Sequence, residues 1–239
     1  MNNVVPVRIM RFDPDTDTLP GYKTYNVPTV PGMTVLQALY HIVERQDGSL
    51  AFRAACRSGV CGSCAMNING ANRLACETQL GLLKPPITVK PLPHLPLIKD
   101  LVADLTSFFE NYERVRPYLL TLSEPPVKER LQSPEDRKKL DNYIDCILCA
   151  CCTTACTVTV SSPNNYIGPA ALTKAYRFIV DSRDEVQAER LRLVANEDGV
   201  LRCHTIFNCT EDCPKSISPT VAIQEIKKMI MGRALTGRL

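Results

Sequence analysis

The residues with the clearest chemistry are twelve cysteines, which fall into three groups along the chain. The first group follows the spacing C-x4-C-x2-C, with a fourth cysteine further on: Cys56, Cys61, Cys64 and Cys76. This triplet is typical of plant-type 2Fe-2S sites, in which four thiolates hold two irons. We therefore predict that one tight loop supplies three ligands and that Cys76 adds the fourth from the end of a following hairpin.

Two glycines inside this loop support the prediction. Gly59 and Gly62 can take backbone conformations that are closed to other residues, so the N–H groups of the loop can turn toward the sulfurs. Such donors help to set the reduction potential of a cluster. A zinc site is the alternative, but zinc favours C-x2-C pairs, and this triplet with interleaved glycines is unusual for it.

The second and third groups follow the bacterial ferredoxin pattern, C-x2-C-x2-C-x3-C. The first run is complete and the second has one substitution: Cys146, Cys149, Cys152 and Cys156 in the first, and Cys203, Ile206, Cys209 and Cys213 in the second. In this pattern three cysteines of a run hold one cluster, and the fourth ligates the cluster of the other run. Two clusters with crossed ligands are therefore predicted.

Crossing the ligands assigns one set of four thiolates, which suits a 4Fe-4S cluster: Cys146, Cys149, Cys152 and Cys213. The other set has three, because Ile206 has no sulfur: Cys156, Cys203 and Cys209. A cube corner without a protein ligand readily loses its iron, so this set predicts a 3Fe-4S cluster. Cys151 fits no ligand position, and a small buried residue is its more common role. Two zinc sites are the alternative, which the crossed spacing disfavours.

The length of 239 residues allows one large domain or two small ones. The composition, 45% hydrophobic and 22% charged, is that of an ordinary globular protein. No apolar run approaches the roughly 18 residues that cross a membrane. The first residues do not follow the pattern of a secretory signal, so the cysteines indicate metal binding rather than disulfides. The net charge of +3 is too small to indicate nucleic-acid binding.

Hydrophobic periodicity in the first hundred residues predicts a small mixed sheet with one main helix. Alternating or β-branched segments predict strands at 4–12, 23–30 and 87–91, and a helical pattern covers 35–43. A hairpin with a tight turn at Asn69-Gly70 is predicted over 65–75. This hairpin would carry the chain from the cysteine loop to Cys76.

The pattern changes after a proline-rich stretch at 84–96, which we interpret as a junction. Helices are predicted beyond it at 104–115, 135–143, 170–180, 185–194 and 219–232. The predicted fold class is therefore α+β. A plant-type ferredoxin (β-grasp) domain with the 2Fe-2S cluster is expected at 1–103. An all-α, bacterial-ferredoxin-like domain with the 4Fe-4S and 3Fe-4S clusters is expected at 104–239.

Together these features resemble the iron–sulfur subunits of succinate dehydrogenase and fumarate reductase, the complex II family. The resemblance covers nearly the whole chain and rests on CRSGVCGSC, KPLPHLPLIKDLVADL, DCILCACC, YIGPAAL, FIVDSRD and CHTIFNCTEDCPK. It implies that a partner flavoprotein oxidises succinate on FAD. Electrons would then pass singly through the 2Fe-2S, 4Fe-4S and 3Fe-4S clusters to a quinone at one or two membrane-anchor subunits. Whether the anchor holds haem stays open.

The resemblance also implies a quinone beside the 3Fe-4S cluster. His204 matches a histidine placed there, and Lys227 matches a basic residue near the same end. The alternatives are a partner-facing histidine and a solvated lysine. Ser161 stands where many relatives have a tryptophan, and this chain has no Trp. Quinone contacts at Ser161 are therefore expected to differ from those of such relatives.

The leading interpretation is the electron-transfer subunit of a succinate:quinone oxidoreductase, peripheral on the cytoplasmic side of the cytoplasmic membrane. We find no flavin or dicarboxylate motif, so the chain is expected to act as a subunit of succinate dehydrogenase without catalytic residues of its own. The same subunit of a quinol:fumarate reductase is the nearest alternative. A free, soluble multi-cluster ferredoxin is another, which the net charge of +3 weakly opposes. A subunit of a different membrane oxidoreductase is a third.

Overall fold

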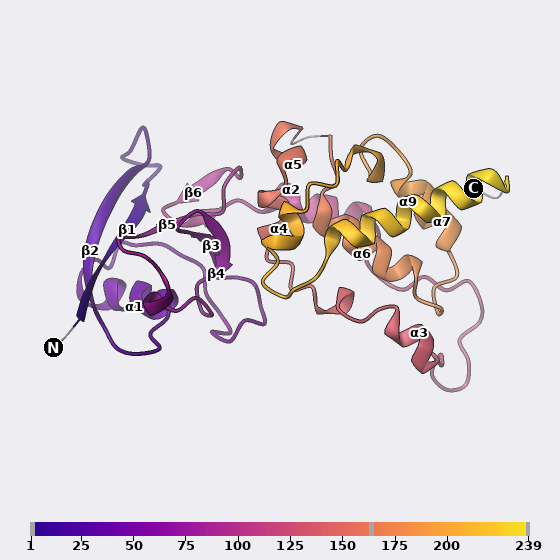
Figure 1. Cartoon of the computed structure of the whole chain (residues 1–239), viewed down its shortest axis with the longest axis horizontal. Coiled ribbons are helices and arrows are strands. Elements are labelled where there is room, and N and C mark those ends of the chain that lie inside the picture. Colours follow the sequence, from indigo (N-terminus) through magenta and orange to yellow (C-terminus); the bar gives the residue numbers. More distant parts are fainter. Residues whose placement is uncertain (1–2, 163–164, 238–239) are drawn as a thin grey trace. The chain divides into compact units, whose positions relative to one another are not determined.

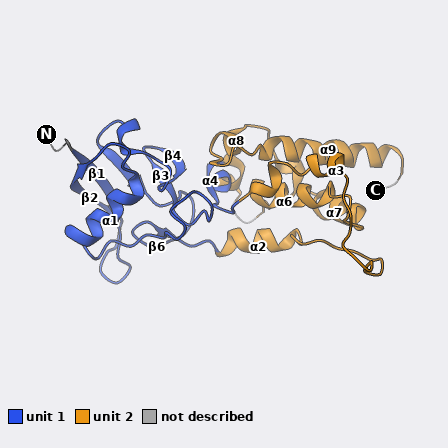
Figure 2. Cartoon of the chain, turned by 90° about the horizontal axis from the view of Figure 1, so that it is seen from below, with its two compact units in different colours: residues 1–105, 147–155 blue, residues 106–146, 156–239 orange. Residues whose placement is uncertain are grey.

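The computed structural model describes residues 3–162 and 165–237. Within these ranges the chain forms two compact units, which Figure 2 colours separately. Unit 1 comprises residues 3–105 and 147–155, and the remaining described residues form unit 2. Unit 1 is thus discontinuous in sequence, and its second segment carries Cys149 and Cys152.

Unit 1 is built on a five-stranded mixed sheet (Figure 1). Its strands are β1 (Asn3–Arg11), β2 (Gly21–Thr29), β3 (Ala65–Ile68), β4 (Ala71–Leu74) and β5 (Ile87–Lys90). They lie in the order β2-β1-β5-β3-β4, and all neighbours are antiparallel except β1 and β5. The strands predicted at 4–12, 23–30, 65–68 and 87–91 are confirmed, with ends that shift by one or two residues.

The predicted tight turn is confirmed between β3 and β4. Asn69 and Gly70 have φ values of 50° and 90°, so both central residues lie in the left-handed region that a type I′ hairpin turn requires. The register pairs Ala65 with Leu74. The turn therefore brings Cys76, two residues past this pair, back toward the cysteine loop that ends at Cys64.

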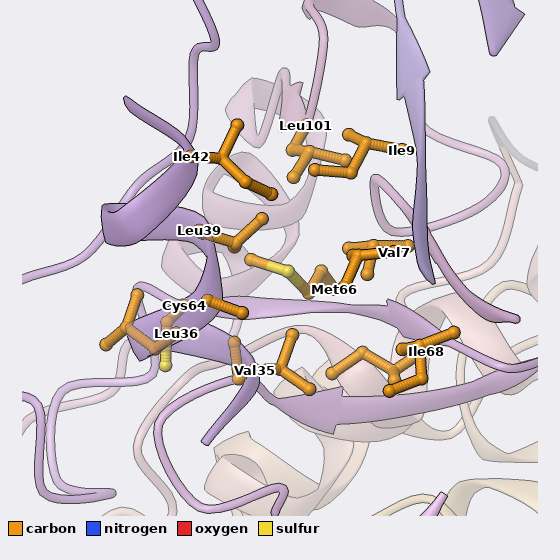
Figure 3. Close-up of a cluster of buried hydrophobic side chains, with 14 of the residues drawn as sticks. Val7, Ile9, Val35, Leu36, Leu39, Ile42, Cys64, Met66, Ile68 and Leu101 are labelled. Carbon is orange, nitrogen blue, oxygen red and sulfur yellow. The ribbon is translucent and has the colours of Figure 1, made fainter. Parts of the chain in front are cut away.

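Helix α1 (Val35–Arg45) lies against the sheet and closes the core of unit 1. Its first turn is fixed by a capping box, in which Thr34 accepts from the Gln37 N–H and the Gln37 side chain accepts from the Thr34 N–H. Figure 3 shows Leu39 and Ile42 of this helix on the side of Val7, Ile9 and Met66, and Leu36 next to Cys64, all within one buried cluster. Cys64 lies in the same cluster, so one predicted ligand is anchored in the core.

The rest of unit 1 extends past the proline-rich stretch. A short 3-10 helix, η1 (Leu80–Leu82), precedes β5, and the strands β6 (Leu97–Lys99) and β7 (Val102–Ala103) form a second, two-stranded sheet. Helix α4 (Cys151–Ala155) belongs to the segment that returns to this unit. The prolines at 84–96 thus lie inside the compact unit, and the change to helices begins after Leu105.

Unit 2 contains helices and no strand among its described residues. The α-helices are α2 (Thr106–Arg114), α3 (Pro134–Lys138), α5 (Thr157–Ser161), α6 (Pro169–Ile179), α7 (Gln187–Val194), α8 (Asn208–Glu211) and α9 (Pro219–Leu235), with 3-10 turns η2 (Tyr143–Asp145) and η3 (Val200–Arg202). Its core comes chiefly from α6, α7 and α9, with Leu172, Ile179, Leu191, Ile223 and Ile226 fully buried. The chain is thus a mixed sheet-and-helix protein, as predicted.

One predicted helix, 135–143, is shorter than expected. Ser133 caps it as predicted, because its hydroxyl accepts from the Asp136 N–H and Pro134 opens the first turn. The α-helix ends at Lys138, however, and Asn142 has a φ of 69°, which no right-handed helix tolerates. A 3-10 turn then leads directly into Cys146.

A buried arginine joins α7 to the segment after α2. Arg190 donates two hydrogen bonds to Asp184, at 2.8 and 3.0 Å. It also donates to the carbonyls of Val115, Arg116 and Tyr118, at 3.2, 2.8 and 2.6 Å. Because both charged side chains are buried, this shared set of acceptors is what satisfies the guanidinium in the core.

Across the parts of the chain that the structure describes, no helix combines the length and the apolar composition that spanning a bilayer requires.

Candidate functional site

The loop that carries the first cysteine group turns its backbone N–H groups toward thiol sulfurs. Cys56 Sγ accepts from the N–H groups of Ser58, Val60 and Cys61, at 3.4, 3.3 and 3.3 Å. Cys76 Sγ accepts from Gly59 N–H at 3.3 Å. These donors stabilise negative charge on sulfur, as cluster ligands require, and the predicted orientation of the loop is confirmed.

The two loop glycines are needed for different reasons. Both have left-handed φ values, 69° at Gly59 and 74° at Gly62. A Cβ at Gly59 would meet the end of the Glu77 side chain, which can move. A Cβ at Gly62 would lie 2.8 Å from the Ile147 carbonyl oxygen and 2.9 Å from the Cys149 Cβ, so backbone would have to shift. The loop therefore packs closely on the returning segment of unit 1.

The four thiols of the first group fall into an exposed pair and a buried pair. Cys56 and Cys61 are exposed, whereas Cys64 and Cys76 are buried. The Ser58 and Val60 N–H groups, and hydrogen bonds from Cys61, lower the pKa of Cys56 to about 6. Burial raises the pKa of the Cys64 thiol to about 12. A positively charged metal centre favours thiolate at both positions, so this donor set fits a cluster set into the surface of the unit.

The two ferredoxin-like runs repeat in backbone conformation as well as in sequence. Leu148 and Ala150, on either side of Cys149, have φ values of 54° and 66°. Thr205 and Phe207, on either side of Ile206, have φ values of 60° and 70°. Left-handed conformations are uncommon for such residues, so their recurrence at matched positions marks a shared loop design. Ile206 therefore occupies the place that Cys149 has in the first run.

The short helices of the two runs obey the same correspondence. Helix α4 begins at Cys151, one residue before Cys152, and α8 begins at Asn208, one residue before Cys209. Each run thus has a left-handed loop around its second ligand position and a helical turn at its third. The alignment made from cysteine spacing is reproduced by the fold of each run.

The cysteines that the repeat predicts as 4Fe-4S ligands are described in the unit to which each belongs. Cys149 and Cys152 belong to unit 1, and Cys146 and Cys213 belong to unit 2. Lys174 Nζ donates to the Cys146 carbonyl at 3.3 Å. Within unit 1, a hydrogen bond from the fully buried Cys151 lowers the pKa of Cys149.

The three cysteines assigned to the 3Fe-4S cluster line one pocket of unit 2. Cys156, Cys203 and Cys209 contribute to its wall, and Ile206 lies at the same pocket with 51% of its surface exposed. This donor set fits a cluster that has one corner without a protein ligand. Over the described ranges, no three His, Cys, Asp or Glu side chains are gathered closely enough to hold a single metal ion.

Two residues of this pocket were not predicted as functional. Tyr166 is buried in the wall, and burial, followed by the charges of Cys203 and Cys156, raises its pKa. Thr220 Oγ1 lies 3.2 Å from Cys209 Sγ. Tyr166 begins the YIGPAAL motif, which could have drawn attention to it. No cysteine-like spacing marks Thr220, because only the fold brings α9 to the cysteines.

The three residues predicted near a quinone have different surroundings in the structure. His204 is exposed and lines the pocket of the three cysteines. Lys227 Nζ donates to the Cys203 carbonyl at 2.8 Å, so this lysine is held at the cysteine run rather than solvated freely. Ser161 ends α5, is exposed, and donates to the Val158 carbonyl; it does not line the pocket.

Two family models match the chain in the order of its cysteine groups. A 2Fe-2S iron-sulfur cluster binding domain matches residues 6–110. A 4Fe-4S dicluster domain matches residues 142–217. The 2Fe-2S domain is thus followed by a domain of the two-cluster type.

Curated relatives match over almost the whole chain. The succinate dehydrogenase iron-sulfur subunit of Paracoccus denitrificans is 48% identical over 97% of this chain and 90% of the relative. The subunit of the same name from Coxiella burnetii is 45% identical over 96% of this chain and 98% of the relative. A chain of the Mycobacterium smegmatis Sdh1 complex in the apo form aligns over 98% of both chains, with a TM-score of 0.84 and 29% identity. This chain therefore belongs to the family of succinate dehydrogenase iron–sulfur subunits.

Proposed function

We propose that this chain is the electron-transfer subunit of a succinate:quinone oxidoreductase. The observation that carries the proposal is the match to subunits of that name over nearly their whole length, with all three cysteine groups inside the matched region. The chain would take electrons from a flavoprotein that oxidises succinate on FAD and deliver them to a membrane quinone. When bound, each cluster supplies a site that accepts and releases one electron.

The first of these sites would be a 2Fe-2S cluster held by the loop of unit 1, with ligands Cys56, Cys61, Cys64 and Cys76. The role of the loop is to hold the thiolates and to donate N–H groups to them. The exposed pair keeps one side of the cluster near the surface, where a partner can approach. The buried pair ties the other side to the core beneath α1.

The second and third sites follow from the crossed repeat. We assign Cys146, Cys149, Cys152 and Cys213 to a 4Fe-4S cluster, and Cys156, Cys203 and Cys209 to a 3Fe-4S cluster. The recurrence of left-handed residues and short helices at matched positions supports the alignment on which this assignment rests. Ile206 leaves one corner of the second cluster without a ligand.

A quinone would bind near the three-iron cluster. His204 is the residue best placed to contact it, because it is exposed and lines the pocket of the three cysteines. Lys227 would act through its hydrogen bond to the Cys203 carbonyl, which orients the run. Ser161 is proposed as a quinone neighbour from the family resemblance alone.

The proposal implies partners and a location. The chain would assemble with an FAD flavoprotein and with one or two membrane-anchor subunits, on the cytoplasmic side of the membrane. Unit 1 would have the β-grasp fold of plant-type ferredoxins, and unit 2 would resemble bacterial ferredoxins. Domain limits at residues 1–103 and 104–239 remain our proposal, with the segment 147–155 packed into the first of them.

Purification of the complex from membranes tests this function. We expect a copurifying subunit with FAD, succinate–quinone activity, and EPR signals of three distinct clusters. Faster fumarate reduction by quinol than succinate oxidation by quinone would favour the quinol:fumarate reductase instead. Recovery of the chain as a soluble carrier without a flavoprotein, or with zinc in place of iron, would contradict the proposal.

A further inference from the structure

Unit 1 buries a pair of asparagines in its sheet. Asn67 on β3 and Asn72 on β4 lie directly opposite each other in the register, and only 9% and 5% of their surfaces are exposed. Buried amides are costly unless they are hydrogen-bonded, and apolar residues would fill a sheet face at less cost. We therefore looked for the hydrogen-bond partners that make burial of this asparagine pair favourable.

The hydrogen bonds of the pair run from the sheet to the returning segment. Asn67 Nδ2 donates to Asn72 Oδ1 at 2.9 Å. Asn72 Nδ2 then donates to the Cys151 carbonyl at 3.3 Å and to Thr154 Oγ1 at 3.1 Å. Flipping the Asn72 amide would set oxygen against the Cys151 carbonyl oxygen, so Asn67 fixes the orientation that the segment needs.

Thr154 extends this network to the turn between two predicted ligands. Its hydroxyl lies 3.2 Å from the carbonyls of both Ala150 and Cys151. The Thr153 and Thr154 N–H groups also donate to the Ala150 carbonyl, each at 3.1 Å. The turn that the network holds is thus the one that separates Cys149 from Cys152.

The same segment is held from the side of the 2Fe-2S loop. Gly62 packs so closely on Ile147 and Cys149 that a single added methyl group would overlap them. The segment therefore rests on the loop at one end and on the asparagine pair at the other. Both contacts lie within unit 1, and both involve backbone atoms of the segment, the Ile147 carbonyl at one end and the Cys151 carbonyl at the other.

We propose that Asn72, oriented by Asn67, is a positioning residue for Cys149 and Cys152, the two thiolates that unit 1 supplies to the 4Fe-4S cluster. This inference rests on the function proposed above. A polar network has a direction that apolar packing lacks, so it selects one register of the segment on the sheet. Its hydrogen bonds to the Cys151 carbonyl and the Thr154 hydroxyl lie in the segment that carries Cys149 and Cys152, so we expect its main effect on the 4Fe-4S cluster.

Asn72→Ala in the membrane-purified complex tests the proposal. We expect the 4Fe-4S EPR signal to fall or to shift its midpoint potential, while the 2Fe-2S and 3Fe-4S signals keep the wild-type intensity. Amide hydrogen exchange in a peptide covering 150–156 should become about tenfold faster. The loss of one buried hydrogen bond costs roughly the free energy that corresponds to a tenfold change in the opening equilibrium. Asn26→Ala, at an exposed position on β2, is the matched control and should change neither measurement.

Thr154 provides a second, milder test. Thr154→Val keeps the side-chain shape and removes the hydroxyl, whereas Thr154→Ser keeps the hydroxyl. We expect the 4Fe-4S signal to be altered in Thr154→Val and preserved in Thr154→Ser. If Asn72→Ala fails to accumulate in membranes, this pair decides, and equal signals in the two variants would overturn the inference.

Two outcomes separate this inference from the function on which it rests. A wild-type complex without a 4Fe-4S signal would overturn the proposed function itself. A wild-type complex with all three signals, combined with unchanged exchange and unchanged cluster signals in Asn72→Ala, would overturn only the role of the asparagine pair. An equal loss of all three signals in both Asn72→Ala and Thr154→Val would show general misfolding and would also count against that role.

Discussion

At the scale of single residues, Ile206 is where the chain departs from its own repeat. Its neighbours Thr205 and Phe207 keep the left-handed conformations found around Cys149, so the loop is shaped for a ligand that the residue cannot provide. The position lines the pocket of Cys156, Cys203 and Cys209. A sulfur placed there would complete a set of four.

We predict that Ile206→Cys converts the three-iron centre into a 4Fe-4S cluster with a lower potential. The added thiolate holds the fourth iron and brings negative charge to the cluster, which disfavours reduction. EPR of the oxidised complex should lose the 3Fe-4S signal, and redox titration should show a second 4Fe-4S centre. Ile206→Val is the control and should keep the wild-type signal. A fully loaded Ile206→Cys complex with an unchanged spectrum would count against the ligand assignment.

The loop glycines lead to a second prediction at this scale. Gly62→Ala should abolish the reduced 2Fe-2S signal, because its methyl group would meet the Ile147 backbone at 2.8 Å. Gly59→Ala should keep more of the signal. It has a similar left-handed strain of about 1–2 kcal/mol, but it clashes only with the movable end of Glu77. Gly81→Ala, with open space around it, is the control. Greater signal loss in Gly59→Ala than in Gly62→Ala would contradict this account.

At the scale of elements, Arg190 holds the segment after α2 onto α7. We predict that Arg190→Met lowers the free energy of unfolding by about 3–5 kcal/mol, because Asp184 would stay buried without its cation. Urea unfolding followed by circular dichroism measures the change. Arg192→Met, an exposed position on the same helix, should change stability by less than about 0.5 kcal/mol. Equal effects at both positions would show that the buried ion pair is not what holds the segment.

Most elements could be predicted from the sequence because their signals are local. Alternation marked β1, Asn69-Gly70 marked the hairpin turn, and Ser133-Pro134 marked the start of α3. The end of α3 at Lys138 could not be predicted, because the helical pattern of the sequence continues beyond it; the left-handed Asn142 lies four residues further on.

Part of the candidate site could be predicted from the sequence, and part of it could not. Cysteine spacing indicated the three groups, and the missing sulfur at Ile206 indicated which set is incomplete. The roles of Asn72, Tyr166 and Thr220 could not be predicted, because each depends on contacts between segments far apart in the chain. The packing of residues 147–155 into unit 1 could not be predicted either, for the same reason. Local spacing therefore predicts which residues are ligands, whereas long-range packing determines where those ligands lie.

At the scale of the whole molecule, we propose that the chain carries electrons between two partners. In this proposal succinate binds to the flavoprotein and not to this chain. We predict that the isolated chain, with its clusters loaded, does not reduce a dye acceptor when succinate is supplied. Adding back the flavoprotein subunit should restore dye reduction, because the flavin performs the two-electron step. Turnover by the isolated chain would overturn its assignment as a subunit.

The discontinuity of unit 1 has a consequence for biosynthesis. Domains begin to fold as they leave the ribosome, N-terminal part first. When Leu105 leaves the ribosome, the four cysteines of the first group are already outside it, whereas residues 147–155, which pack on Gly62, have not yet emerged. During that interval one face of the loop is accessible to whatever delivers iron and sulfide. Because the later segment then packs on Gly62, we expect iron and sulfide to reach this face of the loop more readily before that segment emerges than after it.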